Sequence, residues 1–285
     1  MQVVSVTNER GHRVREKDAY ERLADECAEL RRLNKRLQQL HHQIEYQLQL
    51  AQRIQASFLP KSLPEVPQGR FAVHYQPRDR VGGDFYDVFR LDEQHVGLYV
   101  ADVMGHGVPA SLLTIFIKKG VQAKEVFGHD YRLVPPEDVL QRLNKDLLDQ
   151  HLSEHPFITM TYALYNHRDG IFRFARAGHP YPLYVPQRGE PVFWRQEGFL
   201  LGVADATFPA CSYSLHPGDK VLLYSDGIDS GRFEDHLPGS ASLLAWARRH
   251  CHLPIQKFVD ELARALFSTS ELFDDVTLLG LEVLV

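Results

Sequence analysis

The N-terminal part of the chain is one long segment without helix breakers. From Glu16 to Phe58 the sequence contains no proline or glycine and is rich in Leu, Arg, Gln, Glu and Lys, all strong helix formers. A heptad period fills one core position with Leu23, Leu30, Leu37, Ile44, Ala51 and Phe58, and the other with Glu26, Leu33, Leu40, Gln47 and Ile54. This pattern predicts a coiled-coil-like helix over residues 16–59, which we expect to pair two copies of the chain between Leu23 and Leu50. For the last two turns, packing on the chain's own domain is an equally good interpretation.

The helix is expected to end near residue 60, where a different periodicity begins. Pro60, Pro64 and Pro67 stop it, because proline lacks the amide hydrogen and restricts the residue before it. Short aromatic and β-branched segments predict strands: FAVHYQP, HVGLYVADV, MTYALYN, IFRFARAG, YPLYVP, PVFWR, CSYSL, KVLLYSD and VTLLGLEVLV. Helical spacings occur in VPASLLTIFIKKGVQAKEVF, PEDVLQRLNKDLLDQHL, SASLLAWARRH and IQKFVDELARALF. We expect an α/β (α+β) domain over residues 60–285, with antiparallel sheets and helices outside them, and a disordered segment at residues 1–15.

Charge and cysteine content exclude several classes of function. The formal net charge is -5, so the chain lacks the basic field that draws proteins onto nucleic acids. The cysteines Cys27, Cys211 and Cys251 are too far apart for a zinc cluster or a disulfide framework. The sequence starts without the apolar core of a signal peptide, and no apolar run approaches the roughly 20 residues that span a bilayer. We therefore expect a cytoplasmic protein with no nucleic-acid partner and no membrane span.

Acidic residues stand beside the expected strands at several points: Asp84 in VGGDFYD, Asp102 in VADVMGHG, Asp226 in LLYSDGID, and Asp274 and Asp275 in LFDDVTLL. A carboxylate at the end of a buried strand is costly unless it is hydrogen-bonded, paired or bound to a metal. Mg²⁺ and Mn²⁺ prefer oxygen ligands of this kind, and the neighbouring glycines permit tight turns around an ion. Each acid alone is better explained as a cap or a turn. Together they indicate one shared divalent-metal site.

Several motifs in a fixed order strengthen this interpretation: VGGDFYDVF, VADVMGHGVPASLL, FITMTYALY, FARAGHPYPLY, FLLGV, PGDKVLLYSDGI and FDDVTLL. In this order they resemble the SpoIIE/RsbU branch of the bacterial PP2C-like (PPM) phosphatases, from about Ile54 to the C-terminus. The resemblance implies a PP2C-like sandwich of two antiparallel β-sheets flanked by α-helices, preceded by the long helix. It also implies two Mg²⁺ or Mn²⁺ ions at one edge between the sheets, with a third ion left open.

By motif match, the resemblance assigns metal ligands to particular positions. Carboxylates would come from Asp84, Asp102, Asp226 and Asp274, and a backbone carbonyl from Val103. Asp275 stands where eukaryotic relatives usually carry asparagine, so we expect it, with Gly227, to support the ligands rather than to bind directly. Such a pair of ions lowers the pKa of a bridging water and neutralises the phosphoryl oxygens during hydrolysis.

Two further residues are candidates for the chemistry. Eukaryotic relatives carry a histidine shortly after the second metal-binding aspartate, where this chain has Met104. His106 could relay a proton through water to the leaving serine oxygen, although a turn that supports the metal loop is the simpler interpretation. Arg80 could grip the substrate phosphate, because guanidinium matches phosphate geometry, but an exposed, solvated arginine is the commoner case. His179, in FARAGHPYPLY, is interpreted as shaping a turn.

The sequence thus predicts a metal-dependent phosphatase that acts on phosphoserine or phosphothreonine of a partner protein. The resemblance implies that this partner is a phosphorylated STAS-type anti-anti-sigma factor. The N-terminal helix is expected to control the enzyme under a sensor domain or a separate sensor protein. The alternatives are a catalytically silent PP2C-like module that binds and regulates a signalling partner, and a coiled-coil scaffold. The complete set of acids favours an active enzyme, because a silent module typically loses metal-binding carboxylates.

Overall fold

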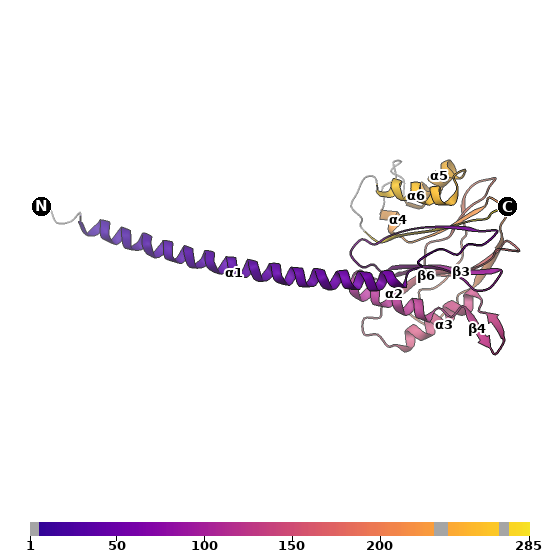
Figure 1. The fold of residues 1–285 in the computed structure, drawn as a ribbon, viewed down its shortest axis with the longest axis horizontal. Coiled ribbons are helices and arrows are strands. Elements are labelled where there is room, and N and C mark those ends of the chain that lie inside the picture. The colour runs from indigo at the N-terminus through magenta and orange to yellow at the C-terminus, as the bar shows by residue number, and fades with distance from the viewer. Residues whose placement is uncertain (1–5, 231–238, 268–273) are drawn as a thin grey trace. The chain divides into compact units, whose positions relative to one another are not determined.

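The computed structural model of the chain describes residues 6–230, 239–267 and 274–285 (Figure 1). The chain divides into two compact units, Met1–Leu50 and Ala51–Val285. Helix α1 spans Val6–Phe58, so its last residues belong to the second unit. Among the residues described, no helix has both the length and the apolar character needed to cross a membrane.

Helix α1 begins earlier than the sequence indicated. We expected a disordered segment at residues 1–15, but residues 6–15 are helical, while residues 1–5 lie outside the described part of the chain. Gly11 costs only about 1 kcal/mol relative to alanine, which is too little to end a helix that strong helix formers continue. Exposed fractions of 49–67% are found for the heptad residues Leu23, Leu30, Leu33, Leu37, Leu40 and Ile44. A single chain therefore leaves this apolar seam open to solvent.

The described part of the second unit contains two five-stranded antiparallel sheets, which confirms the predicted sandwich. One sheet has the order β1-β12-β11-β8-β9, with the strands Arg70–Gln76, Val276–Glu282, Lys220–Tyr224, Leu183–Val185 and Val192–Phe193. The other has the order β10-β7-β6-β3-β2, with the strands Ala210–Ser214, Ile171–Ala177, Ile158–Asn166, His95–Val103 and Asp84–Arg90. Aromatic and β-branched side chains favour these strands, because they pack well on a pleated, buried surface.

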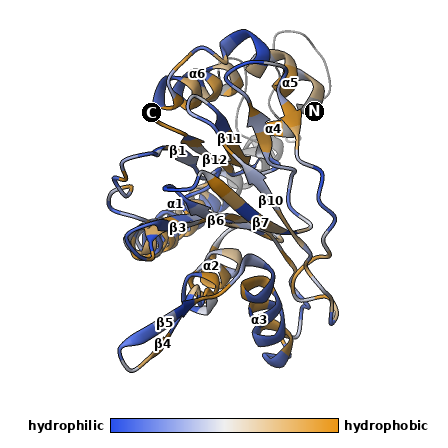
Figure 2. Ribbon diagram, turned by 90° about the vertical axis from the view of Figure 1, so that its right-hand side faces the viewer, coloured by the Kyte–Doolittle hydropathy of each residue, from blue (hydrophilic) through white to orange (hydrophobic). Residues whose placement is uncertain are grey.

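Helices cover the outer faces of both sheets, which gives four layers (Figures 1 and 2). The sheet of β3 and β6 carries α2 (Val108–Gly120) and α3 (Pro136–Asp149), whereas β1 and β12 carry α6 (Ile255–Phe267). On the same side as α6 lie α5 (Gly239–His250) and the short α4 (Gly227–Ser230). Buried clusters fill the space under α2 and α3, the space between the sheets, and the space under α5 and α6.

A small hairpin replaces part of a predicted helix. The apolar pattern from Val108 to Phe127 indicated one continuous helix, but α2 ends at Gly120, and β4 (Lys124–Phe127) pairs with β5 (Asp130–Leu133). The helix stops where Val121 adopts an extended conformation, and the amide of Val121 still donates to the carbonyl of Ile117. Beyond this point Val126 and Phe127 favour a strand.

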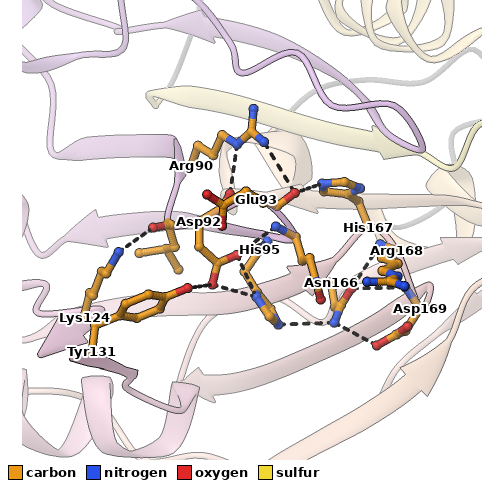
Figure 3. A network of polar contacts seen from close by, with 12 residues as sticks. Arg90, Asp92, Glu93, His95, Lys124, Tyr131, Asn166, His167, Arg168 and Asp169 are labelled. Carbon is orange, nitrogen blue, oxygen red and sulfur yellow. Dashed lines mark hydrogen bonds and ion pairs between the residues drawn. The ribbon is translucent and has the colours of Figure 1, made fainter. Parts of the chain in front are cut away.

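The turn that closes the β2–β3 hairpin is held by a polar network (Figure 3). The carboxylate of Asp92 accepts hydrogen bonds from the backbone amides of Gln94 and His95, at 2.8 Å each, and from the hydroxyl of Tyr131 at 3.0 Å. The His95 ring lies 2.9 Å from the same carboxylate and 3.2 Å from the amide nitrogen of Asn166, where β6 ends. Hydrogen bonds among side chains and backbone amides therefore stabilise this end of the sheet.

Candidate metal centre

The open end of the β2–β3 hairpin brings two of the predicted ligands together. Asp84 begins β2, Asp102 is the next-to-last residue of β3, and the two lie directly opposite each other in the antiparallel register. Asp84 is only 1% exposed, and its Oδ2 accepts a 2.6 Å hydrogen bond from the hydroxyl of Thr277 on β12. Because β12 belongs to the other sheet, this bond joins the two sheets at the candidate site.

Asp226 and Asp274 reach the same edge from the other sheet. Asp226 follows β11 and Asp274 precedes β12, and these strands are antiparallel neighbours, so the two acids come from the same end of the sheet. Both side chains are exposed. Burial, and then the charges of Asp226, Asp274 and Asp275, raise the pKa of Asp102 to about 7. The predicted carboxylates therefore lie within electrostatic reach of one another.

The same repulsion acts on Asp84. Burial and the charge of Asp102 raise the pKa of Asp84 well above its ordinary value, while the hydroxyls of Ser225 and Thr277 act in the opposite direction. Among the described residues, no group of three or more His, Cys, Asp or Glu side chains is close enough to hold a metal ion. The four predicted carboxylates thus converge on one edge but do not form a closed cage.

Asp275 is placed differently from its neighbour Asp274. Its buried carboxylate accepts hydrogen bonds from the backbone amides of Gly83 (2.6 Å), Arg78 (2.7 Å) and Asp84 (3.3 Å). Burial raises the pKa of Asp275, although these three amides act to lower it. The carboxylate is therefore engaged with the loop that precedes β2, and it holds Asp84 in place.

The loop before β2 passes very close to the end of β3. The amide of Val103 donates to the carbonyl of Gly83 at 3.1 Å, and a Cβ atom on Gly83 would lie only 2.7 Å from the carbonyl oxygen of Val103. Only glycine allows the two backbones to approach this closely. The predicted carbonyl ligand Val103 therefore lies against the loop that presents Asp84. Gly227, which was predicted beside the ligands, is buried directly after Asp226 at the start of α4.

His106 and Arg80 lie in surface loops next to the strands that carry predicted ligands. The His106 side chain is 70% exposed between β3 and α2, and its Nδ1 lies 3.6 Å from Oδ2 of Asp79. Arg80 is exposed in the loop before Asp84. Both residues are accessible to an external substrate.

The strand beside Asp102 is supported by a buried histidine. Thr159 is the partner of Asp102 in the β3–β6 register, and its hydroxyl lies 2.8 Å from Nδ1 of His179. Burial, and then the charge of Arg176, lower the pKa of His179 to about 3, so the ring is neutral. His179 therefore also supports β6, which was not expected from its motif. Thr277 was missed as well, although a polar residue next to the run of apolar residues in β12 is a usable signal.

Two packed antiparallel sheets with carboxylates at one shared edge define a PP2C-like protein. The SiaA-PP2C domain of Pseudomonas aeruginosa is similar, with a TM-score of 0.70 and 25% identity over 85% of this chain and 98% of that one. The RsbU and RsbW domains of Rv1364c from Mycobacterium tuberculosis match with a TM-score of 0.68 and 25% identity, over 80% of this chain and 63% of that one. Within this class the chain belongs to the SpoIIE family, because residues 92–284 match the family described as Stage II sporulation protein E.

A relative in sequence is the phosphoserine phosphatase RsbU of Bacillus subtilis (strain 168). It is 27% identical over 249 residues, which cover 86% of this chain and 72% of RsbU. Two more distant structures share the fold. RsbX in complex with magnesium has 16% identity and a TM-score of 0.59, over 78% of this chain and 98% of that one. The catalytic domain of PstP in complex with two manganese ions has 14% identity and a TM-score of 0.56, over 76% of this chain and 99% of that one.

Proposed function

We propose that the chain is a metal-dependent protein phosphatase that hydrolyses phosphoserine or phosphothreonine on a partner protein. The observation that carries this proposal is the convergence of carboxylates from both sheets on one edge, from Asp84, Asp102, Asp226 and Asp274. Membership of the SpoIIE family and the similarity to RsbU, a phosphoserine phosphatase, support it. The alternative is a catalytically silent module, which the complete set of carboxylates disfavours.

The residues at this edge fit divalent cations. The predicted side-chain donors are all carboxylate oxygens, which Mg²⁺ and Mn²⁺ prefer. Burial and three neighbouring carboxylates raise the pKa of Asp102 to about 7, so a cation among them would relieve the repulsion. We assign two Mg²⁺ or Mn²⁺ ions to the ligands Asp84, Asp102, Asp226, Asp274 and the carbonyl of Val103. The assignment leaves the binding of a third ion undecided. The metal complexes of RsbX and PstP, which share the fold, support the assignment.

When bound, such ions supply an activated water and neutralise charge on the phosphate oxygens. The chain's own residues hold the ligands in position, since Thr277 donates to Asp84 and Asp275 binds the loop before β2. The leaving serine oxygen needs a proton, which we propose His106 delivers through water. Arg80, in a neighbouring loop, would contact the substrate phosphate. A His106→Ala variant with an unchanged pH profile and rate on an alkyl phosphate would exclude the role of His106.

Phosphate release from p-nitrophenyl phosphate, with and without Mn²⁺ or Mg²⁺, tests the proposal. We expect metal-dependent release that is lost in Asp102→Asn and in Asp226→Asn. Asp92→Asn, at the other end of the same hairpin as Asp102, is the matched control and should keep its activity. If the chain neither binds these metals nor releases phosphate, the proposal is wrong and the silent module is favoured.

We further infer that the partner is a phosphorylated STAS-type anti-anti-sigma protein. The inference is supported by membership of the SpoIIE family and by the similarity to RsbU and to the structure that contains RsbU and RsbW domains. Purified phosphorylated STAS proteins should be dephosphorylated faster than a free phosphoserine peptide. Equal rates on the proteins and the peptide would reject this class of partner.

We also propose that residues 16–59 form a regulatory helix that pairs two copies of the chain and controls a phosphatase domain at residues 60–285. The exposed seam between Leu23 and Leu50 supports pairing, because a contiguous apolar stripe on a helix usually has a partner. A sensor domain or a separate sensor protein would act on this helix. Deleting the residues before Ile54 should turn a dimer into a monomer in analytical ultracentrifugation and change turnover. A chain that is monomeric at every concentration, with turnover unaffected by the deletion, would contradict the proposal.

A further inference from the structure

A buried glutamine near the end of α1 contacts the loop that presents Asp84. Gln55 is 4% exposed, although its neighbour Ile54 is 48% exposed. The Oε1 atom of Gln55 accepts a hydrogen bond from the amide of Gly82 at 3.3 Å, and its Nε2 donates to the carbonyl of Gly82 at 2.8 Å. The same Nε2 donates to the hydroxyl of Thr114 on α2 at 3.1 Å. One side chain therefore satisfies both backbone groups of Gly82 and reaches a second element.

Two side chains, Gln55 and Asp275, hold this loop at Gly82 and at the residue that follows it. The Gln55 amide binds Gly82 itself, and the Asp275 carboxylate accepts from the next amide, that of Gly83, at 2.6 Å. A Cβ atom on Gly82 would lie 2.5 Å from Oδ2 of Asp275, so the loop is packed against this carboxylate. Asp84 follows Gly83 directly. Its position therefore depends on α1 as well as on the residues beside β12.

The bond to Thr114 extends the contact toward the loop that follows β3. The Thr114 hydroxyl is buried and donates to the carbonyl of Ser111 at 2.7 Å, so it accepts from Gln55 while it donates within α2. Helix α2 begins at Val108, directly after the loop that follows Val103. Gln55 thus links the loop of Asp84 to the helix that follows the end of β3.

We propose that Gln55 is a positioning residue for the metal centre, which fixes the loop that presents Asp84 relative to α2. This inference rests on the proposed function, because it concerns the edge assigned there to divalent ions. Without Gln55, the buried backbone groups of Gly82 would lose their partners, and the loop would move to find others. Because Gln55 belongs to α1, a rotation of residues 51–58 would withdraw its amide from Gly82. The same contact would then pass a change in α1 to the metal centre.

Isothermal titration calorimetry with Mn²⁺, on the full chain and without substrate, tests this inference. Gln55→Met keeps the length of the side chain and removes all three hydrogen bonds. Residues that orient metal ligands typically contribute about 10- to 100-fold to metal affinity, and we expect a loss in this range. Gln52→Met makes the same change at an exposed position of the same helix and should leave the affinity unchanged. Thr114→Val removes only the bond to α2 and should cost roughly 3-fold.

A stability control separates positioning from general loosening of the fold. Val139 on α3 is buried in the core cluster under α2 and α3, so Val139→Ala should lower the unfolding temperature and leave Mn²⁺ affinity intact. An affinity of folded Gln55→Met equal to that of the natural chain would overturn the inference. An equal loss of affinity in Val139→Ala would overturn it too, because lost stability would then suffice. If Gln55→Met does not fold, an unchanged Mn²⁺ affinity in Thr114→Val would overturn the inference instead.

Asp102→Asn distinguishes failure of this inference from failure of the proposed function. If Asp102→Asn abolishes Mn²⁺ binding while Gln55→Met does not weaken it, only the role of Gln55 is wrong. If the natural chain binds no Mn²⁺, or binds it equally well with Asp102→Asn, the metal centre itself is wrong and Gln55 has nothing to position.

Discussion

The two ends of the β2–β3 hairpin place their aspartates in opposite environments. At the turn, the Asp92 side chain is 8% exposed. Burial acts to raise the pKa of Asp92, but hydrogen bonds from Gln94, His95 and Tyr131 lower that pKa below its ordinary value. At the open end, burial and three other carboxylates raise the pKa of Asp102 to about 7. Both acids belong to one hairpin, and both are partly removed from water.

The difference lies in the partners that each carboxylate finds. Asp92 accepts hydrogen bonds from amides and a hydroxyl of its own chain, so its charge stabilises the folded state. Asp102 lies among like charges, so its charged form opposes folding until a cation binds nearby. The turn end therefore stabilises the hairpin, whereas the open end lowers the stability of the fold in the absence of a cation and provides a place where one can bind.

Replacing an aspartate at the open end of the hairpin should abolish phosphate release, whereas replacing the aspartate at the turn should not. Asp84→Asn removes a carboxylate that lies between the sheets. We expect phosphate release to fall by roughly 100-fold or more, because a metal centre contributes several kcal/mol to the transition state. Asp92→Asn should leave the rate nearly unchanged. Rates on p-nitrophenyl phosphate with Mn²⁺ measure both variants, and similar losses in the two would abolish the distinction between the ends.

Divalent cations should stabilise the fold through the open end. A ligand that binds only the folded state adds about 2.7 kcal/mol at 100 times its Kd, which amounts to several degrees in Tm for a unit of this size. Thermal unfolding in Mn²⁺ and in EDTA should therefore differ clearly for the natural chain and little for Asp102→Asn. An equally large increase in Tm for Asp102→Asn would place the stabilising ion elsewhere.

The elements that build the open end follow largely from periodicity. Strands β3, β6, β7, β11 and β12 coincide with aromatic and β-branched segments of the sequence, which local chemistry alone predicts. The meeting of Asp84 and Asp102 is different, because it depends on the register of β2 against β3. The acids beside the strands indicated a shared site, and the family resemblance assigned the ligands, but neither indicated this register. Short apolar runs also suit helix and strand alike, which is why β4 was predicted as part of a helix.

The contacts that hold the acids in place were not predictable from the sequence. Asp275 binds the amide of Gly83, which lies 192 positions away along the chain, and no local pattern encodes that distance. Gln55 is one of many glutamines in α1, and nothing in its neighbours marks it as buried. Supporting roles of this kind depend on tertiary contacts, whereas the acids themselves are marked by adjacent glycines and strands.

Removing the Asp92 carboxylate should destabilise the hairpin without affecting the metal centre. Asp92→Ala leaves the amides of Gln94 and His95 and the hydroxyl of Tyr131 without their acceptor, which should cost on the order of 2 kcal/mol. Urea unfolding measures this loss, and Tyr131→Phe, which removes one of the bonds, should cost about 1 kcal/mol or less. Mn²⁺ affinity should stay constant in both variants. If affinity fell together with stability, the two ends of the hairpin would be coupled rather than independent.

The pH dependence of stability should have opposite signs at the two ends. The folded-state pKa of Asp92 lies below its unfolded value of about 3.9, so its contribution is present above that value and is lost as the pH falls through the lowered pKa. The folded-state pKa of Asp102 is raised to about 7, so its charge opposes folding most strongly above that pH. This penalty shrinks as the pH falls from about 7 toward 4, because the folded protein then takes up the proton first.

Urea unfolding in EDTA, across this pH range, compares each variant with the natural chain. Asp92→Asn should be less stable than the natural chain at about pH 6, and the difference should shrink below about pH 4. Asp102→Asn should be more stable than the natural chain at about pH 8, and this gain should vanish toward about pH 4. If both variants were more stable than the natural chain at neutral pH, or both less stable, the two carboxylates would share one kind of environment. The open end would then have no unbalanced charge for a cation to relieve.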